Sequence, residues 1–339
     1  MIDLRSDTVT KPSLEMYEAM NTAEVGDDVF GDDPTVIELE TTVSDILGFE
    51  AGLFVTSGTQ SNLTAVLTHC GRGDEYVIGE AYHVYHAEGV GTAALGGVIP
   101  QTVPVLSDGS VDLDEVVAKI KPDDTHFPRT KLICFENTHN GKPLSPAYMT
   151  SATTVAKRNG LACHLDGARL MNAATAQSCA PKDLTRGFDT VSLCLSKGLG
   201  APAGSVLSGS LEFIEEARRW RKMLGGGMRQ SGILAACGLV AIRNQVDRLA
   251  EDHALAARLA SGLAQIPEVE TEPQGANTNM VFIKVNGAHR EPLLAHLKSK
   301  GILVGGRPPT FRLVVHRDIQ EADVEATVSQ IAEYFRFSA

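Results

Sequence analysis

The sequence predicts an α/β protein whose mainly parallel sheet is followed by a smaller α+β unit. From about residue 52 to 240, short apolar runs rich in β-branched residues alternate with helical patterns. These runs are apolar throughout, which indicates strands covered on both faces, as in a parallel sheet between helices. The chain has 339 residues, enough for two domains at roughly 150 residues each.

The predicted elements follow in order along the chain. Strands are expected at residues 53–56, 75–79, 132–136, 162–166, 190–196 and 205–208. A long helical stretch at about 231–265 precedes strand 280–285, helix 291–300, strands 302–305 and 311–315, and helix 320–335. Because this last part has the order of a small α+β domain, we expect a large domain at 1–250 and a small domain at 251–339.

Composition and charge argue against nucleic acid and membranes as partners. The 42 acidic residues outnumber the 30 basic ones, and the net charge of −12 disfavours polyanionic partners. The longest strongly apolar stretch, 233–242, is about half the roughly 20 residues of a membrane-spanning helix. The first residues lack the apolar core of a secretory signal, and the six cysteines contain no CxxC pair. We therefore expect a cytoplasmic protein with reduced thiols.

A glycine-containing segment, TSGTQSN at residues 56–62, follows the first predicted strand and precedes helical sequence. Small hydroxyl residues and free backbone N–H groups at a helix N-terminus favour an anion such as phosphate. The same residues also suit simple helix capping, so the segment alone leaves both functions open.

Two charged residues end strands of the predicted sheet. Asp166 lies at the edge where open α/β sheets bind ligands, where it could hold a proton on a heterocyclic nitrogen or cap the next helix. Lys197, in LCLSKGLG (193–200), leaves an apolar strand whose surroundings favour the neutral amine that forms imines. Most lysines at strand ends reach for water. A pyridoxal phosphate site is nevertheless predicted by the combination of the phosphate segment, the acid and the lysine, which follow successive strands.

Seven segments carry a resemblance to a known family. They are IDLRSDTVT (2–10), VGDDVFGDDP (25–34), ENTHNGK (136–142), HLDGAR (164–169), LSKGLG (195–200), RKM (221–223) and GGGMRQ (225–230). The chain resembles the low-specificity L-threonine and L-allo-threonine aldolases, within the aspartate-aminotransferase-like superfamily of pyridoxal phosphate enzymes. The resemblance implies fold type I and cleavage of β-hydroxy-α-amino acids to glycine and an aldehyde such as acetaldehyde. It also implies a homotetramer, a dimer of dimers, with sites at subunit interfaces.

The resemblance assigns the cofactor contacts first. It implies that Lys197 binds pyridoxal phosphate as an imine and that Asp166 pairs with the pyridine nitrogen. His83 would stack on the ring, while Gly58 and Thr59 would hold the phosphate.

The resemblance also assigns the substrate contacts. Ser6 and Arg312, the latter in FRLVVH (311–316), would bind the substrate carboxylate, and Arg169 would lie beside cofactor and substrate. His126 joins the stacking histidine as a candidate for handling the β-hydroxyl proton. Arg229 would reach the phosphate of a neighbouring subunit, so that the site would exist only in an oligomer.

The chemistry explains why histidines matter in such a site. Removal of the β-hydroxyl proton lets the Cα–Cβ bond break, because the cofactor ring takes up the electrons left on Cα. Histidine suits the base because its unperturbed pKa is about 6.5. His83, His86 and Glu88 have a spacing that could also bind a metal, but no cysteine or HExxH pattern completes the set. We therefore expect no metal, and a role for Glu88 in orienting a histidine.

Two charged segments have simpler explanations. The basic run 218–222 is expected to be a solvated helix face, except that Lys222, with Arg229, would lie at a subunit junction near phosphate. The acidic loop 27–33 lacks the twelve-residue ligand spacing of an EF-hand. It is expected to form turns and to cap the helix that begins at Pro34.

Two positions depart from the family pattern, and two other functions stay open. Phe30 stands where many relatives have tyrosine, and Arg307, in GGRPPT (305–310), is a rival to Arg312 as carboxylate binder. Another pyridoxal phosphate lyase, a racemase or an aminotransferase would use the same phosphate segment, acid and lysine. A pyridoxal phosphate-binding carrier without turnover is the alternative from another class.

Overall fold

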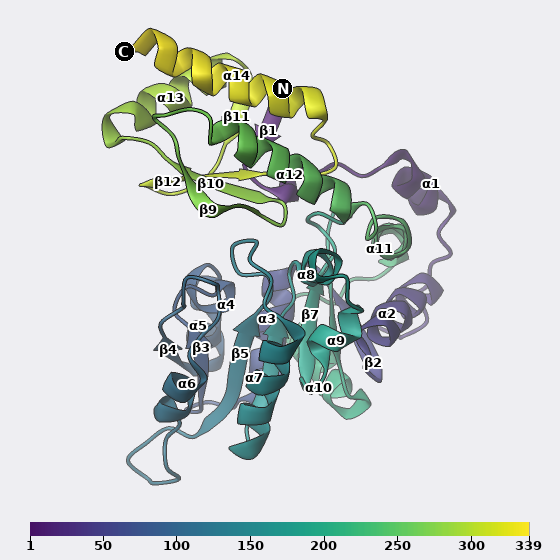
Figure 1. The fold of residues 1–339 in the computed structure, drawn as a ribbon. Helices are drawn as coiled ribbons and strands as arrows, with labels where there is room; N and C mark the ends of the chain where they lie inside the picture. Colours follow the sequence, from purple (N-terminus) through teal and green to yellow (C-terminus); the bar gives the residue numbers. More distant parts are fainter. Residues whose placement is uncertain (339) are drawn as a thin grey trace.

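A seven-stranded sheet forms the centre of the larger unit, in the order β2-β8-β7-β6-β5-β3-β4 (Figure 1). The structure is a computed structural model that describes residues 1–338, without the side chains of residues 273, 274 and 338. The strands are β2 (Ala51–Val55), β3 (Glu75–Gly79), β4 (Ile99–Val103), β5 (Thr130–Glu136), β6 (Ala162–Asp166), β7 (Thr190–Cys194) and β8 (Ser205–Gly209).

The sheet is mainly parallel, as predicted. The pairs formed by β4, β3, β5, β6 and β7 are all parallel, and β8 is antiparallel to both β7 and β2. Strands β5, β6 and β7 are almost completely buried, because helices cover both faces of the sheet. Parallel pairing brings the carboxyl ends of these three strands to one edge of the sheet, which faces the smaller unit (Figure 1).

Side chains at the helix starts explain where several helices begin. Ser57 Oγ accepts a hydrogen bond from Gln60 N at 3.2 Å, and Asp33 Oδ1 accepts one from Val36 N at 3.1 Å. The predicted cap before Pro34 is thereby confirmed. The helices of the larger unit are α1 (Leu14–Thr22), α2 (Pro34–Leu47), α3 (Gly58–His69), α4 (His83–His86), α5 (Gly91–Gly96), α6 (Leu113–Lys119), α7 (Pro146–Arg158), α8 (Leu170–Gln177), α9 (Pro181–Thr185), α10 (Leu211–Met223) and α11 (Gly232–Asn244).

The smaller unit packs three helices on two small sheets. Its strands form the antiparallel sheet β12-β10-β9 and the parallel pair β1-β11. The elements are β1 (Ile2–Leu4), α12 (Leu249–Leu263), β9 (Glu270–Asn277), β10 (Met280–Lys284), α13 (Gly287–Ser299), β11 (Ile302–Val304), β12 (Thr310–Val314) and α14 (Glu321–Ser338). The predicted α+β arrangement is therefore present, and both chain ends lie in this unit (Figure 1).

The structure differs from the predicted elements in two ways. The single helix predicted over 231–265 is two helices, α11 and α12, because α11 packs on α1 and α2 whereas α12 packs on β9 and α14. No glycine or proline marks the turn between them. Strands β1, β4 and β9 were not predicted, since β1 is short, β4 is half-exposed and β9 contains a proline and a glycine.

The two units have separate apolar cores that meet at α12. Leu249 belongs to the core of the larger unit and Ala256 to that of the smaller unit, so the change of core lies close to the predicted division at residue 250. Leu4 lies in the smaller core, although the N-terminal segment was expected with the larger domain. Of the helices in residues 1–338, none is long and apolar enough to cross a membrane.

Candidate active site

A pocket of about 740 Å³ lies between the two units, over the carboxyl ends of β5, β6 and β7. The larger unit contributes Glu136, Asp166 and Lys197 to its lining, and the smaller unit contributes Arg307 and Arg312. The structure thus brings the predicted strand-end acid and lysine to one cavity. The hydrogen-bond partners, burial and neighbouring charges of each residue determine its chemistry.

Asp166 is a buried carboxylate at the end of β6. Its Oδ1 accepts a hydrogen bond from Ala168 N at 3.0 Å, and its Oδ2 accepts one from Asn62 Nδ2 at 3.0 Å. Burial raises the pKa of Asp166 and the charge of Glu136 adds to this, while the charges of Lys197 and His83 oppose it. The two hydrogen-bond donors of Asp166 are neutral. A cationic ring nitrogen placed against this carboxylate would give it a positively charged partner.

His83 lies at the start of α4 and is oriented by Glu88. The His83 Nδ1 atom is 2.8 Å from Glu88 Oε1, which also accepts a hydrogen bond from Asn62 Nδ2 at 2.9 Å. The hydrogen bond to Glu88 raises the pKa of His83. The expectation that Glu88 orients a histidine is confirmed, and Nδ1 is committed to it, which leaves Nε2 as the free ring nitrogen.

The metal-like spacing noted in the sequence is only partly realised. One ligand atom each from His83, Glu88 and Asp166 lie within 4.8 Å of one another. His86 is not in this group, because its Nε2 lies 2.9 Å from an Arg307 nitrogen instead. His83 and Asp166 line the pocket, and Asn62 connects Glu88 to Asp166. The cluster therefore belongs to the site already described.

A second histidine and its acid partner line the pocket and were not predicted. His139 Nδ1 lies 2.8 Å from Glu136 Oε1, and both residues are buried. The other oxygen of Glu136 accepts a hydrogen bond from the backbone N–H of His83. Glu136 therefore fixes the start of α4, and with it the histidine that faces the pocket. Both residues lie in the ENTHNGK segment, which begins at the last residue of a predicted strand, and this position was the available signal.

The start of α3 offers a place for an anion beside Asp166. Gly58 and Thr59 form the first two positions of this helix, whose N–H groups point away from the helix body. Ser205 Oγ is buried without a hydrogen-bond partner among the described residues, and a Cβ atom on Gly58 would sit 3.6 Å from it. Asn62, one turn further along α3, contacts Asp166. An anion bound here would therefore lie one helical turn from the acid.

Arg169 is held in place by Asp7. Two nitrogens of Arg169 contact the two oxygens of Asp7, at 2.7 and 2.6 Å. Asp7 is fully buried, and desolvation alone would raise its pKa. The charge and hydrogen bonds of Arg169, the charge of Lys197 and the Asn279 hydrogen bond together outweigh desolvation and lower the pKa of Asp7 to about 2. Asn279 Nδ2 also contacts Asp7, at 3.3 Å, so this pair joins the N-terminal segment to both units. Asp7 is a site residue that the sequence did not single out.

We expect Asp7→Asn to destabilise the protein by about 3 kcal/mol, since it leaves a buried arginine without its carboxylate. Because the pKa of Asp7 is depressed to about 2 from 3.8, its stabilising contribution is complete above about pH 4 and is lost as pH falls through 2. Urea unfolding at pH 7 measures the effect. Asp3→Asn, which breaks a partly exposed pair with Arg5, is the matched control and should cost less than about 1 kcal/mol. Equal losses for both variants would contradict the prediction.

Arg312 lines the smaller unit's side of the pocket, and Ser6 does not. The Arg312 Nη2 atom donates to the backbone oxygen of Arg5 at 3.1 Å, next to Ser6 in the chain. Arg312 Nε is buried without a partner among the described residues, and desolvation lowers the pKa of Arg312. Arg312 therefore has donor capacity left for an anion in the pocket. Ser6 does not line the pocket in this chain, because its Oγ accepts from Thr8 N.

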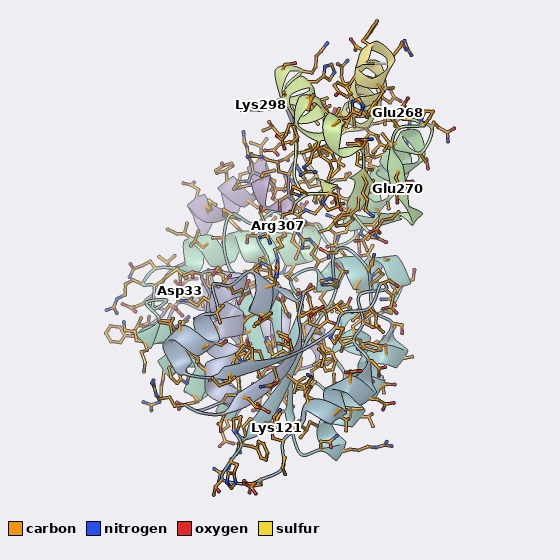
Figure 2. All side chains as sticks on the ribbon, turned by 90° about the vertical axis from the view of Figure 1, so that its left-hand side faces the viewer. Asp33, Lys121, Glu268, Glu270, Lys298 and Arg307 are labelled. Carbon is orange, nitrogen blue, oxygen red and sulfur yellow. The ribbon has the colours of Figure 1, made fainter. Side chains whose placement is uncertain are left out.

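His126 lies outside the pocket of its own chain. It is exposed, pairs with Asp124 at 2.6 Å, and belongs to the loop between Lys121 and the start of β5. Figure 2 labels Lys121 at the end of the larger unit remote from the smaller unit. Roughly 20 Å of β5 separates this loop from the carboxyl end of the strand. A role for His126 at this pocket therefore requires another subunit.

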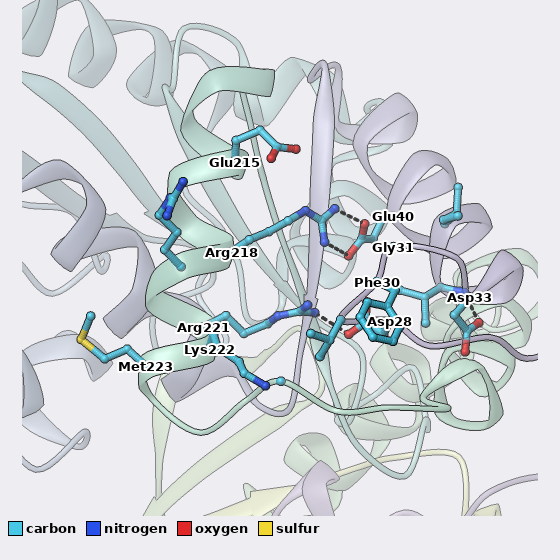
Figure 3. A pocket seen from close by; sticks show the side chains of 15 residues that line it. Asp28, Phe30, Gly31, Asp33, Glu40, Glu215, Arg218, Arg221, Lys222 and Met223 are labelled. Atoms are coloured by element: carbon cyan, nitrogen blue, oxygen red, sulfur yellow. Dashed lines mark hydrogen bonds and ion pairs between the residues drawn. The ribbon is translucent and has the colours of Figure 1, made fainter.

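Arg229 and Lys222 lie near a second pocket, of about 830 Å³, between loop 27–33 and α10 (Figure 3). Arg229 is half-exposed and pairs with Asp27 at 3.0 Å. The basic run of α10 is only partly the solvated face that was expected, since Arg219 is exposed but Arg218 and Arg221 are paired against the larger unit. Arg218 pairs with Glu40 at 2.6 Å, and Arg221 is buried against Asp28 at 2.9 Å, because α10 packs on the sheet and on α3. Figure 3 shows both pairs.

Comparisons with known proteins agree on one family. The model of the Beta-eliminating lyase family matches residues 3–286. The low specificity L-threonine aldolase of Escherichia coli strain K12 is 47% identical over 336 residues, which cover 99% of this chain and 98% of the relative. Low-specificity L-threonine aldolase 1 of Arabidopsis thaliana is 44% identical, over 97% of this chain and 94% of the relative.

Solved structures show the same fold at lower identity. The threonine aldolase of Leishmania major matches with a TM-score of 0.84 at 20% identity, over 98% of this chain and 99% of that one. The predicted type of fold is therefore present in full, with both units included.

Proposed function

Because the chain belongs to the low-specificity threonine aldolases of the beta-eliminating lyase family, we propose that it cleaves L-threonine and L-allo-threonine to glycine and acetaldehyde. Its cofactor is pyridoxal phosphate. The observation that carries the proposal is the meeting of Lys197 and buried Asp166 in one pocket at the carboxyl ends of adjacent strands. Other β-hydroxy-α-amino acids fall within the same proposal.

Turnover of both diastereomers tests this function. Purified holoenzyme should release acetaldehyde and glycine from L-threonine and from L-allo-threonine, measured side by side. Pyruvate, or a requirement for an amino-group acceptor, without acetaldehyde would favour another pyridoxal phosphate lyase, a racemase or an aminotransferase. Tight cofactor binding with no glycine released from any β-hydroxy amino acid would favour a carrier.

The residues present fit this cofactor. When bound, pyridoxal phosphate supplies an aldehyde for covalent attachment and a protonated ring that accepts the electron pair left on Cα. Lys197 would supply the amine for that attachment, and Asp166 would hold the proton on the ring nitrogen. The first turn of α3, with Gly58, Thr59 and the unpartnered Ser205 hydroxyl, would hold the phosphate.

His83 is proposed to cover the ring and to accept the β-hydroxyl proton at Nε2. Glu88 holds Nδ1, which fixes the ring orientation and supports the positive charge that forms on proton uptake. Glu136 accepts a hydrogen bond from the backbone N–H of the same residue. Arg312 is proposed to bind the substrate carboxylate together with Ser6, while Arg169, held by Asp7, lies beside them.

Replacing Glu88 by glutamine should move the acid limb of the pH profile of kcat/KM to lower pH. The base must be neutral to accept a proton, and Glu88 raises the pKa of His83. Without that carboxylate the histidine loses its proton at lower pH. Glu80→Gln, an exposed acid at the preceding turn, is the control and should leave the limb in place. An unmoved limb in Glu88→Gln would exclude His83 as the titrating base.

The proposal extends to assembly and compartment. We propose a homotetramer in which Arg229 reaches a neighbouring subunit's phosphate and His126 reaches a neighbouring pocket. Two observations support an interface near the second pocket, where Phe30 and Met223 are 79% and 72% exposed. Light scattering of the purified protein measures the assembly. We place the enzyme in the cytoplasm, since none of its six cysteines forms a disulfide.

A further inference from the structure

Arg307 is an arginine at the mouth of the active-site pocket that has no carboxylate partner. It lies in the turn between β11 and β12, and Figure 2 labels it where the two units meet. Its Nη1 atom contacts His86 Nε2 at 2.9 Å. The guanidinium is always protonated and can only donate, so the His86 Nε2 atom accepts. In the part of the chain that the structure describes, no carboxylate oxygen lies within 4.0 Å of an Arg307 nitrogen.

The carboxylates that line the pocket are already committed to other partners. Glu136 and Asp166 make the hydrogen bonds described above. Glu272 lies 3.4 Å from Lys142 Nζ. Arg307 is therefore a cation on the pocket wall that is held by a neutral ring nitrogen only. A carboxylate is a stronger partner for a guanidinium than an imidazole is, because the hydrogen bonds are then charge-assisted on both sides and paired.

The position of Arg307 distinguishes it from Arg312. Arg312 is close enough to Arg169 and Asp7 to be affected by their charges, at the side of the pocket proposed for the α-carboxylate. The partner of Arg307, by contrast, is His86, one turn along α4 from His83. His83 is proposed to act on the β-hydroxyl, so its neighbour Arg307 would face the β-carbon of a bound amino acid. Arg312 would face the α-carboxylate. This step rests on the proposed function.

We propose that Arg307, with His86, binds a carboxylate carried on the β-carbon of the substrate, so that the enzyme also cleaves 3-hydroxyaspartate to glycine and glyoxylate. The Cα–Cβ bond breaks, the hydroxyl proton leaves, and the Cβ–O bond becomes the aldehyde of glyoxylate. The electron pair stays with Cα and takes up a proton to give glycine. The sum of the two products equals the substrate, and no oxidant or reductant is required.

The test compares two substrates in wild type and two variants. Arg307→Gln removes the charge, and Lys298→Gln removes an exposed charge of α13 in the same unit as a matched control. Wild type should release glycine and glyoxylate from 3-hydroxyaspartate, assayed as both L-threo and L-erythro forms. Arg307→Gln should lower kcat/KM for 3-hydroxyaspartate about 10- to 100-fold, mainly through KM, which is the range for a lost charged hydrogen bond. For L-threonine the change should stay below about threefold, and Lys298→Gln should affect neither substrate.

A binding measurement separates the anion site from a role of Arg307 in joining the two units. L-Aspartate and L-alanine lack the β-hydroxyl, so they bind the holoenzyme without cleavage, and the cofactor absorbance reports their binding. Arg307→Gln should weaken L-aspartate about 10-fold or more and leave L-alanine unchanged. Equal weakening of both ligands, or an equal loss of threonine and 3-hydroxyaspartate cleavage, would overturn the proposal.

The outcomes for wild type keep the two proposals apart. Cleavage of threonine without cleavage of 3-hydroxyaspartate would overturn the anion site alone. Cleavage of neither substrate by a holoenzyme with normal cofactor absorbance would overturn the proposed aldolase function. Cleavage of both substrates by wild type, with loss of 3-hydroxyaspartate cleavage alone in Arg307→Gln, supports the aldolase function and the anion site.

Discussion

Replacing Lys197 by alanine is expected to lower threonine cleavage on the order of 10³-fold or more, because the variant loses the strand-end amine that is proposed to attach the cofactor at this pocket. Lys197 follows β7 by three residues and lines the same pocket as Asp166. Methyl in place of the aminobutyl chain leaves the strand and the glycines after it intact, so the loss should be chemical. Acetaldehyde release at saturating threonine measures it.

The covalent link itself supplies a second measurement for Lys197→Ala. Borohydride should fix the cofactor on the wild-type peptide that contains Lys197, with loss of the visible absorbance, and should fix none on the variant. Lys157→Ala, an exposed lysine of α7, is the matched control and should behave as wild type in both assays. Full cleavage of both threonine diastereomers by Lys197→Ala would show that the assignment of the lysine is wrong.

Asp166→Asn is expected to lower cleavage by about 10²-fold or more, the scale found when a buried group that stabilises developing charge is removed. The amide has nearly the shape of the carboxylate, but its one oxygen can accept from only one of the Ala168 and Asn62 donors, which contact different oxygens of Asp166. It lacks the charge that holds a proton on the ring nitrogen, so the ring becomes a poorer electron acceptor. The cofactor should also bind more weakly, because a buried ion pair is replaced by a neutral contact.

Cofactor affinity and threonine kcat, measured on the same preparation, test Asp166→Asn. Asp114→Asn, an exposed acid of α6, should leave both quantities unchanged. If Asp166→Asn kept wild-type affinity and a kcat within threefold of wild type, the carboxylate would not be the partner of the ring nitrogen. Circular dichroism of each apoprotein checks that the folds are the same.

Much of the fold could be predicted because strand patterns are local. The runs that end at Asp166 and Cys194 contain buried apolar residues and no exposed position, as expected of strands that lie between helices. The missed strands lacked it. Strand β4 lies at a half-exposed sheet edge, and β1 is three residues long and is fixed only by its pairing with β11. The turn between α11 and α12 follows from a change of packing partner, which no local residue marks.

Some residues of the site could likewise be predicted from the sequence, and others could not. The acid and the lysine end strands of one sheet, so their positions along the chain predict that they meet. Glu88, five residues from His83, was also within reach of spacing arguments. His126 and Arg229 lie away from this chain's own pocket, and their predicted roles depend on subunits that a single chain does not contain. The burial of Arg221 against Asp28 was missed because charge composition does not tell which face of α10 packs inward.

The sequence by itself determined the buried strands of the central sheet, the chemistry of the strand-end acid and lysine, and the family. Only the tertiary structure decided which groups control them. Asn62 meets Asp166 across 104 residues, Asp7 meets Arg169 across 162, and His86 meets Arg307 across 221. The physical reason is that hydrogen bonds and ion pairs act over a few ångströms. They therefore depend on which distant segments the packing of the two cores brings together. The local sequence pattern does not predict these contacts.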